Sequence, residues 1–140
     1  MARLPMEQKQ KKVVGTKQTI KVLRQKLPER VRLVASDCYN PAWWSGRVRG
    51  ATLDIHHYQC FSPADRAREA YEDHKVILQA AEIQYQRYAR QQPLIIGEWS
   101  ATLPANVQTK TIARQFCQDQ SLLLAYADVW FFWSYKTEHA

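Results

Sequence analysis

Short apolar runs alternate along the chain with longer stretches in which apolar residues recur every three or four positions. The apolar runs predict strands at 31–36, 51–58, 94–99 and 128–134. The longer stretches predict helices at 6–27, 62–90 and 107–126. This order predicts an α/β fold with parallel strands and right-handed crossovers. The connection over 39–51 is too short for a long helix, so we expect a loop or a short helix there.

Several residues mark where the elements begin or end. Pro28 ends the first helix, because the residue before a proline disfavours the helical conformation. Ser62, Pro63 and Asp65 form a helix start, with a capping serine, a proline in the first helical position and an acid in the first turn. Pro93 opens the third strand, where the missing N–H is tolerated.

The third predicted strand ends in a single carboxylate. Its first half, from Leu94 to Ile96, is an apolar run typical of a strand covered on both faces. Gly97, Glu98 and Trp99 follow, and alternation places Glu98 on the same face as Leu94 and Ile96. Burying a carboxylate is costly unless it is paired or has a function. The octapeptide from Pro93 to Ser100 alone leaves both interpretations open.

The second predicted strand carries three polar side chains on one face. Asp54, His56 and Tyr58 alternate with Ile55 and His57. A histidine in a strand is more often a hydrogen-bonded structural residue than a catalytic one. The alignment of three polar groups next to the strand that carries Glu98 nevertheless favours a functional site.

Functional groups of a parallel sheet gather at the carboxyl ends of its strands. The groups expected there are Asp37 and Tyr39, His56 and Tyr58, Glu98 and Trp99, and Trp133 and Tyr135. One carboxylate, one imidazole and several aromatic rings suit a carbohydrate, whose apolar ring faces stack on aromatic side chains. We therefore expect Trp99 to add to the substrate-binding aromatics. The alternative is that these rings close one end of the core.

The net charge of +7 is concentrated at the amino terminus. Residues 1–30 hold nine lysines and arginines against two acids, whereas residues 31–140 hold eleven of each. A basic arm of this kind binds nucleic acid or an anionic membrane in some proteins. No aromatic residues interleave with the lysines, so a solvated helix face is favoured and neither nucleic acid nor membrane is expected as a partner.

The three cysteines, Cys38, Cys60 and Cys117, have no metal-ligand spacing. Cys38 and Cys60 are expected near the ends of neighbouring strands, where a bridge is conceivable, but free thiols are favoured. No metal and no cofactor is expected. The apolar run from Leu122 to Trp133 is interrupted by Asp128 and is too short to span a bilayer.

Three stretches occur in a distinctive order. They are Leu53-Asp54-Ile55-His56-His57-Tyr58-Gln59, then Ile95-Ile96-Gly97-Glu98-Trp99-Ser100, then Trp130-Phe131-Phe132-Trp133-Ser134-Tyr135-Lys136-Thr137-Glu138. Together they resemble family 5 glycoside hydrolases of the cellulase superfamily, in particular the exo-β-1,3-glucanase branch. The resemblance spans about residues 31–138. It implies the last four strands of an eight-stranded (β/α)8 TIM barrel, with residues 1–30 as the preceding barrel helix and residues 31–140 as a half-barrel.

The resemblance also implies roles for individual residues. Glu98 matches the nucleophile of a retaining glycosidase, which forms a covalent glycosyl-enzyme. His56 and Tyr58 match the pair that holds that carboxylate and the sugar near it. Trp133 matches the aromatic floor of the first sugar subsite, and Tyr39 and Phe61 match an aromatic clamp for the next sugar. The implied substrate is a β-glucan or β-glucoside, and related fungal enzymes are largely secreted.

One departure from the family pattern limits the expected activity. A retaining hydrolase needs a second carboxylic acid about 5 Å from the nucleophile, and the family carries it in an Asn-Glu-Pro motif that this sequence does not contain. The chain thus looks like the nucleophile-bearing C-terminal half of an enzyme. Four parallel strands leave two open edges, so we expect a homodimer, a separate N-terminal half, or marginal stability. We expect little or no glycosidase activity from the isolated chain.

Two other functions remain open at this point. The chain could be a non-catalytic remnant that binds carbohydrate or a protein partner through the aromatic platform. A nucleic-acid binder that uses the basic arm is the least favoured interpretation.

Overall fold

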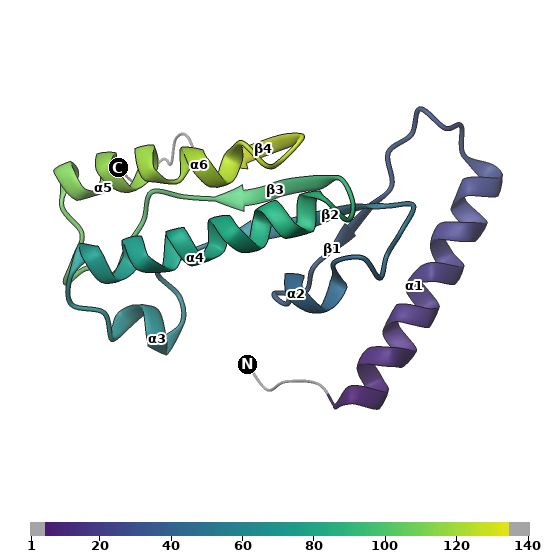
Figure 1. Ribbon diagram of the computed structural model, residues 1–140, viewed down its shortest axis with the longest axis horizontal. Coiled ribbons are helices and arrows are strands. Elements are labelled where there is room, and N and C mark those ends of the chain that lie inside the picture. Colours follow the sequence, from purple (N-terminus) through teal and green to yellow (C-terminus); the bar gives the residue numbers. More distant parts are fainter. Residues whose placement is uncertain (1–4, 135–140) are drawn as a thin grey trace.

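The computed structural model describes residues 5–134, except for the side chain of Lys9. Its four strands form one sheet in the order β1-β2-β3-β4, and every neighbouring pair is parallel (Figure 1). The strands are β1 (Val34–Ser36), β2 (Thr52–His57), β3 (Leu94–Trp99) and β4 (Val129–Phe132). The predicted α/β class with an all-parallel sheet and intervening helices is confirmed.

The first helix precedes β1, and the other described helices lie in the connections between the strands. The helices are α1 (Met6–Lys26), α2 (Pro41–Trp44), α3 (Pro63–Arg66), α4 (Tyr71–Ala89), α5 (Lys110–Asp119) and α6 (Ser121–Leu124). The connection between β1 and β2 contains only the four-residue α2, as its length predicted. Helix α1 stands beside β1, at the opposite end of the molecule from α5 and α6 (Figure 1).

The core lies between one face of the sheet and the helices that cover it. The sheet contributes the almost fully buried side chains of Leu53, Ile55, Leu94 and Ile96. Leu78 and Tyr85 of α4, Phe116 of α5 and Leu123 of α6 pack against them. Helix α1 joins this cluster through Val13, with Ile20 partly buried beside it. Burial of this apolar face is the main source of stability for the sheet.

The predicted helix over 62–90 is wrong in one respect, because it is two helices. Ser62 caps α3 as expected, and its side chain and that of Asp65 form a capping box. The carbonyl oxygen of Arg68 then accepts a hydrogen bond from Asn106 Nδ2 at 3.0 Å. Ala70 is extended and precedes the first residue of α4. A continuous helix would use the Arg68 carbonyl oxygen for its own backbone hydrogen bond, and here Asn106 binds that oxygen instead.

Other predicted boundaries also shift. The helix expected over 107–126 is divided into α5 and α6 at Gln120, whose side-chain Nε2 donates to the carbonyl oxygen of Ser100 at 2.9 Å. The first strand is shorter than predicted, because Val31 is held in the turn after α1. Its N–H donates to the carbonyl oxygen of Pro28, and its own carbonyl oxygen accepts from Arg24 Nη1.

A register shift overturns the predicted facing of Glu98. Leu94 pairs with Leu53 and Ile96 with Ile55, but Glu98 pairs with His56, and the shift occurs between Ile55 and His56. Glu98 therefore shares the face of His56 and not that of Leu94 and Ile96. A bulge reverses the alternation that a regular strand imposes.

The other face of the sheet carries Ser36, Asp54, Ile95 and Val129, which the strand pairing brings into register. Arg32 Nη1, before β1, lies 2.7 Å from Asp128 Oδ2, before β4, so the two long side chains connect the edge strands. Among the described residues both edges of the sheet are unpaired, so a closed barrel is not present.

Candidate functional site

Glu98 lies at the carboxyl end of β3, and two side chains from the β2 segment contact its carboxylate. The Tyr58 hydroxyl donates a hydrogen bond to Glu98 Oε2 at 2.9 Å. His56 Nδ1 lies 3.4 Å from the same oxygen. His56 and Tyr58, which the sequence placed on one face of β2, are thus together with Glu98, which the sequence placed near them on the next strand. Both contacts hold Oε2, and within residues 5–134 the other oxygen, Oε1, has no hydrogen-bond partner. The Glu98 side chain is 36% exposed, so a ligand can approach it.

His56 also connects Glu98 to a second carboxylate. Its Nε2 lies 3.4 Å from Asp54 Oδ2, so both ring nitrogens face a carboxylate. Only the doubly protonated ring donates to both sides, because a neutral imidazole has one N–H. Asp54 is placed by Gly97: a Cβ on Gly97 would overlap Asp54 Oδ1 and lie 2.8 Å from its Cγ. Gly97 makes room for Asp54, which contacts one nitrogen of the His56 ring. Glu98 contacts the other nitrogen of the same ring.

Three of the predicted aromatic residues are exposed near this cluster. Phe61 packs edge-on against Tyr58 with ring centroids 5.0 Å apart, and Tyr39 meets His56 edge-on at 6.2 Å. Trp133 is exposed, and its backbone N–H donates to the carbonyl oxygen of Trp99 at 2.7 Å. Solvent-exposed rings beside a carboxylate are a suitable surface for a sugar. Tyr135, expected on the same face as Trp133, lies outside the described residues.

Trp99 differs from its predicted role. It is only 4% exposed and belongs to the core cluster. Its ring packs against Phe132 at 4.9 Å and Trp130 at 5.6 Å between centroids. Trp99 pairs with His57, one position beyond the Glu98–His56 pair, so it points to the opposite face of the sheet. The structure gives Trp99 a packing role on the helix side.

A buried acid lies near His56 at the end of β1. Asp37 is almost fully buried, and this burial raises its pKa to about 6, against the opposing effects of the Tyr39 N–H and His56. Its Oδ1 accepts from the Tyr39 N–H at 2.9 Å. Cys38 and Tyr39 both have positive φ, at 48° and 58°, so Asp37 holds a backbone that non-glycine residues rarely adopt. Its burial makes Asp37 a support for the Tyr39 loop and not a group that reaches a ligand.

Two other histidines are structural. His57 is buried, its Nδ1 lies 3.0 Å from the Tyr85 hydroxyl, and burial lowers its pKa to about 4. His74 is fully buried, and its Nδ1 lies 2.9 Å from Gln59 Oε1. The sequence placed His57 on the face opposite His56, but its pairing with Tyr85 depends on the packing of α4 and has no local sequence signal.

The described residues contain no cluster of three or more metal-ligating side chains. Cys38, Cys60 and Cys117 are all free thiols, as the sequence favoured. Across the described part of the chain, none of the helices combines the length and the apolar character needed to cross a bilayer.

The chain was also compared with known proteins. No protein-family model matches it, and no curated protein is significantly similar to it. The resemblance to glycoside hydrolases therefore rests on the three sequence stretches alone.

Proposed function

We propose that this chain is the nucleophile-bearing half of a retaining β-glucosidase or β-glucanase of the family 5 type. The observation that carries the proposal is the Glu98 carboxylate, held through Oε2 by Tyr58 and His56 with Oε1 open to a ligand. The four parallel strands correspond in this proposal to strands five to eight of a (β/α)8 barrel. The exposed rings of Tyr39, Phe61 and Trp133 form the sugar platform.

The proposed reaction uses Glu98 as a nucleophile. Oε1 attacks the anomeric carbon of a β-glucoside, a C–O bond forms, and the glycosidic bond breaks with its electron pair on the leaving oxygen. An alcohol leaving group needs a proton at this point, and the sequence has no Asn-Glu-Pro acid to provide one. The chain should therefore react only with activated glycosides whose leaving group departs as a stable anion. Water then hydrolyses the glycosyl ester.

Covalent trapping tests this proposal. We expect 2,4-dinitrophenyl 2-deoxy-2-fluoro-β-glucoside to add one fluoroglucosyl group per chain, located at Glu98 by peptide mapping. Glu98→Gln should show no adduct, and the matched variant Glu69→Gln, at an exposed acid outside the site, should be labelled like the parent. A folded chain that stays unlabelled, or is labelled elsewhere, contradicts the proposal. Hydrolysis of the β-1,3-glucan laminarin that depends on Glu98 would show that a proton donor is present after all.

The hydroxyl of Tyr58 should affect the rate of the same reaction. Tyr58→Phe removes the hydrogen bond that holds Oε2 and leaves the ring packed on Phe61. We expect trapping to slow about tenfold, equivalent to about 1.4 kcal/mol, because the carboxylate loses its fixed orientation. The trapping rate constant at saturating reagent measures this effect. An unchanged rate, with unchanged circular dichroism, would show that Tyr58 does not position Glu98.

A second function is supported by the exposed aromatics alone. The chain would then be a non-catalytic carbohydrate- or partner-binding module that retains the platform of Tyr39, Phe61 and Trp133. Laminarin binding that Trp133→Ala abolishes, in a chain that the fluoroglucoside never labels, would favour this alternative.

A further inference from the structure

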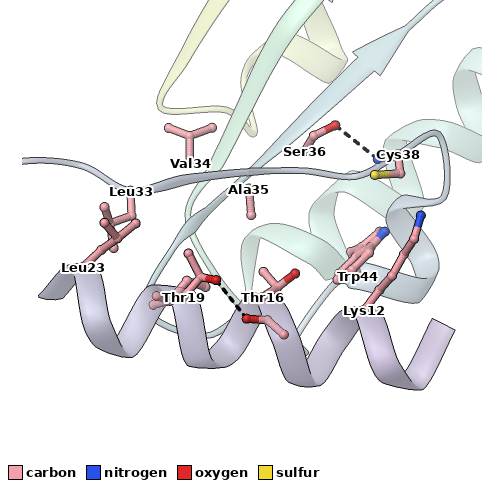
Figure 2. Close-up of a pocket in the computed structure, with 12 residues that line it drawn as sticks. Lys12, Thr16, Thr19, Leu23, Leu33, Val34, Ala35, Ser36, Cys38 and Trp44 are labelled. Atoms are coloured by element: carbon pink, nitrogen blue, oxygen red, sulfur yellow. Dashed lines mark hydrogen bonds between the residues drawn. The ribbon is translucent and has the colours of Figure 1, made fainter. Parts of the chain in front are cut away.

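Helix α1 lies beside the free edge of β1, and among the described residues no strand pairs with that edge. Helix α1 runs alongside β1, and an open groove of about 520 Å³ lies between them (Figure 2). Leu23, Thr19, Thr16 and Lys12 point from α1 toward β1 in this view. Leu33, Ala35 and Trp44 make much of the opposite wall apolar. Gly15 lines the same groove and has open space where a Cβ would stand.

The backbone of β1 is free to pair on the groove side. The Leu33 carbonyl oxygen accepts from the Thr52 N–H, and the Asp37 N–H donates to the Asp54 carbonyl oxygen, so these residues bond toward β2. Successive residues of a strand bond to opposite sides. Val34 and Ser36 therefore direct their N–H and C=O groups away from β2, toward the groove. Val34 is 52% exposed.

The other edge of the same sheet is an unprotected apolar strand. All four residues of β4 are exposed, and Phe131 is 56% exposed. The Trp133 N–H bonds back to the Trp99 carbonyl oxygen, so by alternation Trp130 and Phe132 direct their backbone groups outward. Strand β4 contains none of the charges or prolines that usually prevent edge pairing.

These two edges complement each other. We infer that two copies of this chain pair edge to edge, with β4 of each copy lying parallel to β1 of the other beneath α1. Trp130 lies on the helix side of β4, where it packs against Trp99, so in this pairing its ring enters the groove of the partner. A two-fold axis makes both contacts identical. When both contacts form, the strands of the two sheets close on themselves as one eight-stranded barrel, and neither exposed edge remains.

The second copy is favoured because one chain supplies both halves of the contact. The groove is mainly apolar, so an apolar strand suits it. Strand β4 is apolar throughout, and a two-fold axis along the strands sets it parallel to β1. This inference concerns the sheet edges and does not depend on the sugar chemistry proposed above.

Sedimentation equilibrium of the full 140-residue chain tests the inference. We expect about twice the chain mass of 16.4 kDa. Val34→Pro removes an N–H that faces the groove, and Trp130→Pro removes one that faces outward from β4. Each should raise the dimer dissociation constant at least about tenfold, or 1.4 kcal/mol, without changing the circular dichroism spectrum. Val76→Lys, at an exposed position on α4, should leave the dimer intact.

Mixing the two proline variants separates this arrangement from other dimers. A mixed dimer has one contact made by two intact edges, so an equimolar mixture should dimerise more tightly than either variant alone. A parent chain that is monomeric at high concentration, a mixture no tighter than its components, or open-ended assembly beyond the dimer would each overturn the inference. The trapping experiment measures a covalent adduct at Glu98, whereas sedimentation measures the mass of the assembly. Either proposal can therefore fail while the other holds.

Discussion

Gly97→Ala is expected to destabilise the protein by about 2–4 kcal/mol, because overpacking at this position displaces a buried carboxylate. The added methyl group would overlap Asp54 Oδ1, which is buried without a hydrogen-bond partner among residues 5–134. The φ angle of Gly97 lies outside the left-handed region, so the requirement for glycine is one of space. Displacing Asp54 also removes its contact with His56, so trapping at Glu98 should slow in the fraction that remains folded.

Urea denaturation measures the loss, and the chain contains its own matched control. Gly15 is an interior residue of α1, and a Cβ there meets nothing within 4 Å. Gly15→Ala should therefore gain up to about 1 kcal/mol from helix propensity. If both substitutions changed the free energy of unfolding equally, the close contact between Gly97 and Asp54 would not be what the strand requires.

Asp37→Asn is expected to stabilise the protein at neutral pH and to have little effect in acid. The pKa of Asp37 is 3.8 in an unperturbed side chain and is raised to about 6 by burial in the folded protein. A raised pKa means that the fold favours the protonated form. The contribution of Asp37 to stability is thus complete below pH 3.8 and is lost as the pH rises through 6. The difference of about two pKa units corresponds to about 3 kcal/mol at pH 7.5.

The asparagine keeps an oxygen for the Tyr39 N–H and carries no charge, so it avoids this cost. The free energy of unfolding of Asp37→Asn, relative to the parent, should rise between pH 4 and pH 7 and then become constant. The same titration on Glu69→Gln, at an exposed acid, controls for general charge effects. A stability difference that stays the same at pH 4 and pH 7.5 would show that the Asp37 carboxylate is not destabilised by burial.

Much of the fold was readable because local signals agreed. The third strand was predicted over Leu94–Trp99 and is found there, since its apolar run, its proline and its glycine all point to the same boundaries. The capping signal at Ser62 was equally reliable. The helix predicted over 62–90 does end where expected, at Ala89. Its interruption after α3 was not predictable, because the Asn106 side chain that binds the Arg68 carbonyl oxygen comes from 38 residues away.

The candidate site was likewise predicted in part from the sequence and in part decided by the tertiary structure. The sequence brought Asp54, His56, Tyr58 and Glu98 together by strand facing and strand order, and their mutual contacts are present. It predicted the wrong partners for Glu98 on its own strand, because a bulge is invisible to period-two alternation. It also placed Trp99 in the site, because proximity along the chain does not reveal which face of the sheet is covered by helices.

The sequence by itself determined the order of strands and helices, the parallel direction of the sheet, and the identity of the polar residues at the ends of β2 and β3. These follow from periodicity, capping residues and crossover rules, which depend on neighbours along the chain. Only the tertiary structure decided that Gly97 makes room for Asp54, that Asp37 is buried, and that α1 covers a groove at an unpaired edge. Each of these depends on residues distant in sequence, whose approach is set by how the helices and strands pack together.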